Sequence, residues 1–91
     1  MLDKGAKMKL SAKQCKIVCL LPFLTNREIG QALGTGFNQM KNQTSAIYRA
    51  LGVPDYPNND DKRIAAIVYA LRDGEVSFDF FVSTVLTTIR F

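Results

Sequence analysis

Residues 25–53 read TNREIGQALGTGFNQMKNQTSAIYRALGV, and this stretch decides the fold. Thr25 and Glu28 stand three positions apart, the spacing of a capping box that starts a helix. Gly34 follows the first apolar stripe, where a glycine commonly ends a helix. After a short connection, a longer helix is predicted over residues 37–51. The stretch is therefore expected to form two helices joined by a tight turn.

The helix predicted over residues 37–51 has two unlike sides. Apolar or small residues recur at the spacing of one helix face and are expected to be buried: Phe37, Met40, Thr44, Ile47 and Leu51. The opposite side is polar and basic: Asn38, Gln39, Lys41, Asn42, Ser45 and Arg49. Small basic proteins read the major groove of DNA with a helix of this kind, supported by two others.

Two further helices flank this pair. The first is predicted over residues 11–21, because Ser11 can cap its start and Pro22 disfavours the helical conformation in the residue before it. Another is predicted over residues 60–72, with an apolar stripe made of Ile64, Val68 and Leu71. Residues 10–74 are thus interpreted as a four-helix domain.

Both ends of the chain differ from this domain. Residues 1–9 are lysine-rich without periodicity, and we expect a basic arm there. Residues 75–91 form a C-terminal extension whose apolar side chains fit a helical stripe: Phe78, Phe81, Val82, Val85, Leu86 and Ile89. Its β-branched and aromatic content is typical of a strand, so both structures stay open, although the periodicity favours a helix. The expected fold class is all-α.

The distribution of charge favours a polyanionic partner. Residues 1–53 contain eight lysines and arginines and two acidic residues, a net charge of +6. Residues 54–91 contain four basic and six acidic residues, a net charge of −2. The basic half coincides with the predicted helix pair, which indicates a surface for a polyanion such as DNA.

The composition also indicates where in the cell the protein is expected. A chain of 91 residues with 47% hydrophobic and 22% charged residues is typical of one globular domain. Its longest apolar run, residues 17–24, contains Pro22 and is too short to cross a bilayer, and no signal-peptide pattern precedes it. We therefore expect a cytoplasmic protein with no membrane partner.

The residues needed for metal binding or nucleophilic catalysis are sparse. The chain has no histidine, so neither a Ser-His nor a Cys-His pair exists. Cys15 and Cys19 share one face of a predicted helix, but their parallel Cβ vectors suit a disulfide poorly, and two cysteines alone leave a zinc site incomplete. We expect two small apolar side chains, no metal, no cofactor and no enzymatic activity.

Several short motifs carry a resemblance to a known family. They are Thr25-Asn26-Arg27-Glu28-Ile29, Leu33-Gly34, Lys41-Asn42, Ile47-Tyr48-Arg49 and Leu51-Gly52-Val53. In this order and spacing, residues 10–53 resemble the helix-turn-helix domain of LuxR-type (GerE-like) bacterial transcription regulators. Lys62-Arg63-Ile64-Ala65-Ala66 is similar to the start of the family's fourth helix. The resemblance implies a four-helix fold, DNA binding and a dimer formed through helix 60–72.

The sequence departs from the family pattern at four places. Gln43 replaces the usual histidine, and Gln39-Met40 replaces Thr-Val before Lys41. Gly36 replaces a serine cap, and Pro22-Phe23 replaces a turn that contains glycine. We also expect the protein to act without the receiver or autoinducer-binding domain of the family. These departures affect the family's DNA contacts at those positions and leave its core pattern intact.

The favoured hypothesis is a stand-alone, sequence-specific DNA-binding transcription regulator of a bacterium or phage, acting as a homodimer on double-stranded DNA. Its base contacts are predicted at Gln39, Lys41 and Asn42, whose side chains can bond adenine or guanine. Its phosphate contacts are predicted at Thr25, Asn26, Arg27, Asn38, Ser45 and Arg49. The dimer contact is expected in helix 60–72, in the C-terminal extension, or in both.

The alternative is a small protein–protein interaction module, such as an anti-activator that binds another regulator. Gln43 and Gly36 favour it mildly, because both depart from the DNA-binding pattern, while the +6 charge of residues 1–53 opposes it.

Overall fold

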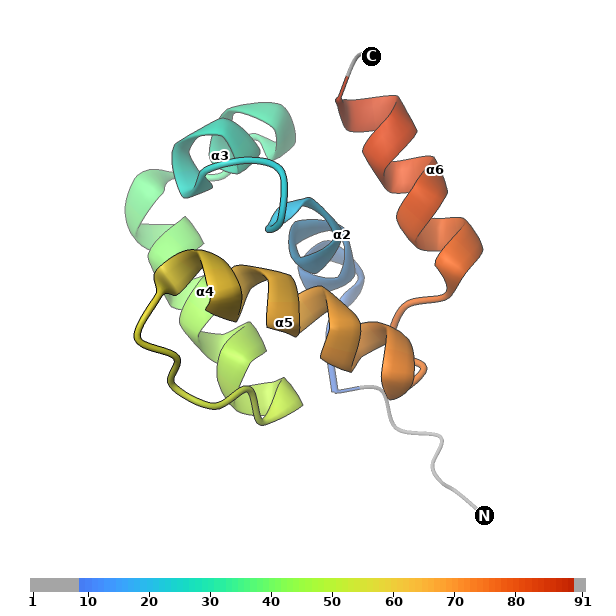
Figure 1. Cartoon of the computed structure of the whole chain (residues 1–91). Coiled ribbons are helices and arrows are strands. Elements are labelled where there is room, and N and C mark those ends of the chain that lie inside the picture. Colours follow the sequence, from blue (N-terminus) through green and yellow to red (C-terminus); the bar gives the residue numbers. More distant parts are fainter. Residues whose placement is uncertain (1–8, 90–91) are drawn as a thin grey trace.

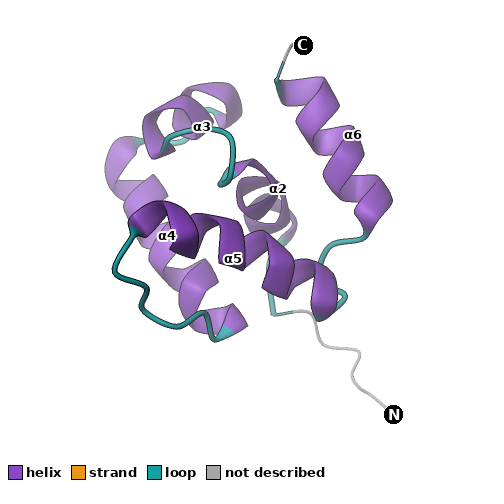
Figure 2. Cartoon of the chain, in the orientation of Figure 1, coloured by secondary structure: helices purple, strands orange, loops and turns teal. Residues whose placement is uncertain are grey.

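The computed structural model describes residues 9–89 and builds this part of the chain from helices and loops alone (Figures 1 and 2). The helices are α2 (Ala12–Leu20), α3 (Asn26–Leu33), α4 (Phe37–Leu51), α5 (Asn59–Arg72) and α6 (Phe78–Thr88). The predicted all-α class is confirmed. Apart from Lys9, the predicted basic arm lies outside the described residues, as do the last two residues of the C-terminal extension.

The helix starts follow local side-chain chemistry. The predicted capping box of α3 is present: the Thr25 hydroxyl accepts from the Glu28 amide at 3.2 Å, and the Glu28 carboxylate accepts from the Thr25 amide at 2.9 Å. Ser11 caps α2 as predicted, and Gln14 completes a second box there. Because these caps satisfy amides that have no partner inside the helix, they fix the residue at which each of the two helices begins.

Helix α2 is the centre of the domain. It packs against α4, α5 and α6, which surround it in Figure 1. Every residue from position 17 to position 21 is buried, so the C-terminal half of α2 is covered on all sides, while Ala12 and Lys16 in its first half are exposed. The other large side chains that are fully buried come from its neighbours: Ile29 of α3, and Met40 and Ile47 of α4. One continuous core therefore supports the α3–α4 pair from behind.

Two glycines set the close turn between α3 and α4. Gly34 caps α3 in the left-handed conformation, with φ at 69°, which side chains disfavour. Gly30 lies against the turn, and a Cβ atom there would meet the Thr35 carbonyl oxygen at 2.6 Å. The Thr35 amide donates to the Gly30 carbonyl at 2.8 Å. The turn can be this tight because neither glycine carries a side chain.

The stripe predicted for α4 is wrong at one end. Met40, Thr44, Ile47 and Leu51 are buried as expected, but Phe37 is 67% exposed. Phe37 is the first residue of α4, and it lies about one turn before Met40, the first buried residue of that helix. Periodicity alone could not reveal that the first turn of the helix extends past the core.

The stripe predicted for α5 is rotated from the observed one. Ile64 and Val68 are 50% and 54% exposed, while the inward residues are Arg63, Ala66, Ile67 and Ala70. Two alanines on the inner face let α5 approach the core closely. The buried arginine has its own partners, described below. Leu71 of the predicted stripe is partly buried against the core, whereas Ile64 and Val68 are left on the outer surface of α5.

The C-terminal extension forms a helix, so the periodicity was the better guide to it. α6 packs along α2 and buries Val85, with Phe81 and Ile89 partly buried against the core. Phe78 and Leu86, predicted in the same stripe, are exposed. Among residues 9–89, no helix has both the length and the apolar character needed to span a membrane.

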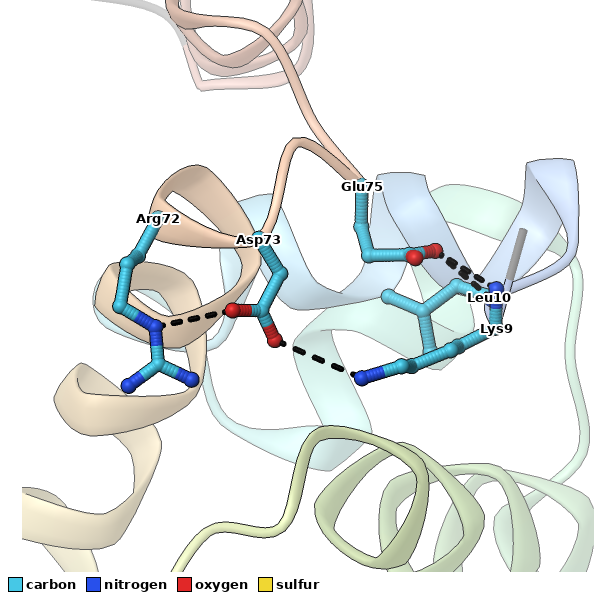
Figure 3. Close-up of polar contacts among 5 residues, drawn as sticks. All are labelled: Lys9, Leu10, Arg72, Asp73 and Glu75. Atoms are coloured by element: carbon cyan, nitrogen blue, oxygen red, sulfur yellow. Dashed lines mark hydrogen bonds and ion pairs between the residues drawn. The ribbon is translucent and has the colours of Figure 1, made fainter. Parts of the chain in front are cut away.

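A polar clasp ties the start of α2 to the segment between α5 and α6 (Figure 3). The buried Glu75 carboxylate accepts from the backbone amides of Lys9 and Leu10 at 2.9 and 3.0 Å. Asp73 lies between Arg72 and Lys9, at 2.8 and 3.8 Å from their nitrogens. Val76 follows Glu75 into the core. The chain thus continues from the four-helix part into α6 through buried residues.

Candidate nucleic-acid interface

The predicted recognition face of α4 is open to solvent. Six side chains predicted to contact DNA are all exposed along this helix: Asn38, Gln39, Lys41, Asn42, Ser45 and Arg49. They lie opposite the buried residues Met40, Thr44, Ile47 and Leu51. Because α4 runs for 15 residues, it can present these groups over about 22 Å at 1.5 Å per residue. The arrangement is a long polar edge with one basic group near its middle, Lys41, and another near its C-terminal end, Arg49.

Contacts with the core and with α2 fix which face of α4 is exposed. Thr44 turns inward and its hydroxyl donates to the Met40 carbonyl at 2.7 Å. Gln43, at the position of the family's histidine, accepts a hydrogen bond at 2.8 Å from the Gln14 side chain of α2. This glutamine therefore links two helices of the fold and lies beside the exposed polar face. Its observed role is a side-chain hydrogen bond between α4 and α2.

The remaining residues predicted to contact DNA lie at the start of α3, and they differ in exposure and in the hydrogen bonds they already make. Thr25 and Arg27 are exposed, although the Thr25 hydroxyl oxygen already accepts a hydrogen bond from the Glu28 amide. The Asn26 side-chain oxygen accepts from the Arg63 guanidinium at 2.8 Å. Asn26 thus has one half of its amide occupied within the fold and keeps its NH₂ group as a donor. Arg27 is the cation of this set, and residues 9–89 supply no ion-pair partner for it.

A cleft separates the start of α3 from the start of α4. Arg27 and Gln31 line one side of it, and Thr35, Gly36 and Phe37 line the other. Gly36 is the N-cap of α4 and offers no side-chain oxygen, so the first amides of α4 keep their donors for another acceptor. A helix N-terminus beside an arginine is a favourable place for a phosphate oxygen. The buried Thr35 hydroxyl, for which residues 9–89 supply no partner, lies in the same wall.

Arg63 is a structural residue that the sequence pattern did not reveal. It is 9% exposed, and its guanidinium donates to the Leu21 carbonyl at 3.0 Å, to the Leu24 carbonyl and to Asn26. These acceptors belong to the turn between α2 and α3 and to the first residue of α3. Arg63 therefore fixes where α3 begins. Lys62, the residue before it, is also basic and is only partly buried, so no local signal in the sequence distinguished the cation that enters the core.

The two cysteines belong to the core. Both thiols are free and buried on α2. Burial raises the pKa of Cys19 to about 12, with a smaller contribution from Cys15. Burial, followed by the charge of Glu75, raises the pKa of Cys15 as well. Protonated, enclosed thiols are poor nucleophiles and poor metal ligands. Within residues 9–89, no group of three or more histidine, cysteine or acidic side chains is placed to hold a metal ion.

Comparisons with protein-family models, curated proteins and solved structures found no match. The assignment of function therefore rests on the chain itself: the α3–α4 turn, the polar face of α4 and the distribution of charge.

Proposed function

We propose that the protein is a sequence-specific DNA-binding transcription regulator of the LuxR/GerE-like helix-turn-helix type. It would act in the cytoplasm of a bacterium or a phage-infected cell, without enzymatic activity. The observation that carries the proposal is the exposed face of α4, where six polar or basic side chains lie opposite a fully buried stripe. Helix α4 enters the major groove, and α3 crosses the backbone beside it.

Base and phosphate contacts are divided along this surface. Lys41, Asn42 and Gln39 reach base edges, because lysine can bond guanine, while asparagine and glutamine can bond adenine in two places. Phosphates are bound around this helix by Thr25, Asn26, Arg27, Asn38, Ser45 and Arg49. The donors at the start of α4, next to Arg27, add a site for one backbone phosphate.

Removing the central side chains of this face should weaken DNA binding selectively. We expect Lys41→Ala and Asn42→Ala each to cost about 1–3 kcal/mol of specific affinity when a base contact is lost. The measurement is a binding titration on duplexes first selected from random DNA. Lys16→Ala on α2 is the matched control, since it removes an exposed lysine away from α4. Unaltered affinity and sequence preference in both test variants would refute the proposed recognition face.

A salt titration of the unmodified protein tests DNA binding as such. Each phosphate contact releases counterions, so the logarithm of affinity should fall linearly with the logarithm of salt concentration, by about 0.9 per phosphate contacted. The six side chains and the start of α4 that are assigned to phosphates give up to seven contacts and a steep loss, whereas an interaction module with a residual basic surface would show a shallow one.

We further propose that the protein binds DNA as a homodimer, through α5, α6 or both. Exposed apolar side chains support this: Ile64 and Val68 on α5, and Phe78 and Leu86 on α6. Two copies would place their recognition helices in successive turns of the groove.

Charged substitutions should identify the dimer contact. In an isologous dimer, Val68→Glu places two like charges near the symmetry axis, so we expect it to shift the sedimentation coefficient from dimer to monomer. Leu86→Glu makes the same change on α6 and serves as the comparison. Because both side chains are exposed, the thermal midpoints should stay close to the parent value. If the parent chain sediments as a monomer at high concentration and on DNA, the dimer proposal fails.

The second candidate is the protein–protein interaction module. The observation that favours it is the number of large apolar side chains at the surface of α5 and α6 in so small a domain. This candidate would be preferred if the selection from random DNA yielded no enriched sequence while another regulator bound the apolar surface.

A further inference from the structure

A cleft at the C-terminal end of α4 continues the proposed DNA surface onto α5. Ser45 and Arg49 of the recognition face line it on one side. Lys62, from the first turns of α5, lines the other side together with Asp55, from the segment that joins the two helices. The cleft thus places a lysine from outside the α3–α4 pair beside the last basic residue of the recognition helix.

Lys62 is held in a fixed position in this cleft. Its ammonium nitrogen lies 2.7 Å from the Asp55 carboxylate and 4.7 Å from the centre of the Tyr48 ring. The lysine side chain is only 20% exposed. A cation that is already ordered loses less side-chain entropy when it binds an anion than a free surface lysine does. The cleft therefore offers a prepared positive group.

Asp55 is the replaceable partner of this ion pair. Its side chain is 96% exposed, so the carboxylate is hydrated outside the pair and contributes little to stability. The hydrogen bond from Lys62, followed by the charge of that lysine, lowers the pKa of Asp55, which is therefore ionised at neutral pH. An external anion can exchange with such a carboxylate without leaving a buried group unpaired.

The backbone of the cleft does not oppose an anion strongly. Two of the last four carbonyls of α4 already accept hydrogen bonds: Arg49 from the Gly52 amide at 3.2 Å, and Tyr48 from the Val53 amide at 3.0 Å. The groups that remain for a ligand are two cations and the Ser45 hydroxyl. Their spacing along the edge of α4 matches a surface that follows a DNA strand past the recognition helix.

We propose that Lys62 and Arg49 bind one phosphodiester of the DNA backbone, and that Asp55 occupies Lys62 in the free protein as an internal substitute for that phosphate. This inference rests on the proposed function. DNA binding then exchanges one ion pair for another at Lys62, and the carboxylate lowers the affinity for every sequence equally. The joining segment between α4 and α5 thereby sets the strength of binding, while α4 sets its specificity.

The test is a double-mutant cycle on a duplex selected with the full-length protein. We expect Asp55→Asn to raise affinity about two- to fivefold near 0.1 M salt, the range of an exposed ion pair. Lys62→Met keeps the aliphatic stem over Tyr48, and it should lower affinity and reduce the salt slope by about 0.9. In the Lys62→Met background, Asp55→Asn should have no further effect. Thermal midpoints are recorded for every variant, to show that each one is folded.

Asp61→Asn is the matched control, because it removes the same charge from α5 without a bond to Lys62. If Asp61→Asn raises affinity as much as Asp55→Asn, or if Asp55→Asn acts equally without Lys62, the effect is general electrostatics and the inference is overturned. An unchanged salt slope in Lys62→Met also overturns it. These results leave the proposed function standing if the parent protein binds its selected duplex, whereas the absence of any selected duplex removes both.

A direct measurement separates a DNA phosphate from free phosphate. The carboxyl resonance of Asp55 is followed by NMR during addition of duplex DNA, and separately of inorganic phosphate at millimolar concentration. Release of the carboxylate by the duplex alone is expected. Release by inorganic phosphate alone would assign the cleft to a small anion, and no response to bound duplex would show that Asp55 is not displaced.

Discussion

A chain that ends at Ser77, and so lacks α6, should lose most of its stability. Val85 is buried, and Phe81 and Ile89 pack against the core that α6 shares with α2. At about 1.5–3 kcal/mol for each fully buried side chain, their loss is on the order of 5 kcal/mol, comparable with the whole stability of a small domain. We expect a broad or absent thermal transition by circular dichroism.

The cut after Ser77 is chosen because Glu75 and Val76 belong to the buried part of the fold. Leu86→Ser is the control on the same helix, since this exposed side chain should change stability by no more than about 0.5 kcal/mol. Sedimentation of the shortened chain decides between the two roles of α6. A folded monomer with an unchanged midpoint, from a dimeric parent, would assign α6 to self-association and refute its role in the core.

Arg63→Met should be the most damaging conservative substitution in α5. It leaves the Leu21 and Leu24 carbonyls and the Asn26 side chain without their donor, at a cost of about 1–3 kcal/mol for each buried group left unsatisfied. Partial access of water lowers the sum, and we expect a loss of about 2–4 kcal/mol in urea unfolding. The start of α3 should loosen with it, because all three acceptors surround that point.

Arg72→Met provides the comparison at the other end of α5. Arg72 is exposed and bonds its neighbour Asp73 at 2.8 Å, a surface ion pair worth about 0–1 kcal/mol. Amide exchange at the start of α3 should accelerate in Arg63→Met and remain unchanged in Arg72→Met. Equal stability in the two variants would mean that the guanidinium of Arg63 is replaceable by water.

The helices of the domain were predictable wherever neighbouring residues decide them. Thr25 and Glu28 cap each other, and Gly34 ends α3, through contacts that span a few positions. The inner face of α4 was also readable, since Met40 and Ile47 follow the helical period. The predicted contact residues on α4 share one exposed face, but their binding to DNA remains a prediction.

The features that could not be predicted from the sequence depend on contacts between residues far apart in the chain. The rotation of α5 is set by Arg63, whose acceptors lie 37 to 42 positions away. The role of Gly30 depends on its approach to the turn before α4, which no periodicity records. Phe37 and Ile64 satisfy an apolar pattern and still lie at the surface, because a pattern gives the face of a helix without giving the extent of the core.

The buried cysteines give the domain an internal reporter of motion. Cys15 bonds the Glu75 carbonyl at 3.5 Å, and Cys19 is covered where α2 meets α6. An alkylating reagent can reach the Cys19 sulfur only after α2 and α6 separate, and the Cys15 sulfur only after its contact with Glu75 opens. Its labelling rate, divided by the rate for an unfolded chain, therefore measures the free energy of opening the contacts that cover α2. Because the two thiols lie one helical turn apart, unequal rates would reveal from which end α6 comes away.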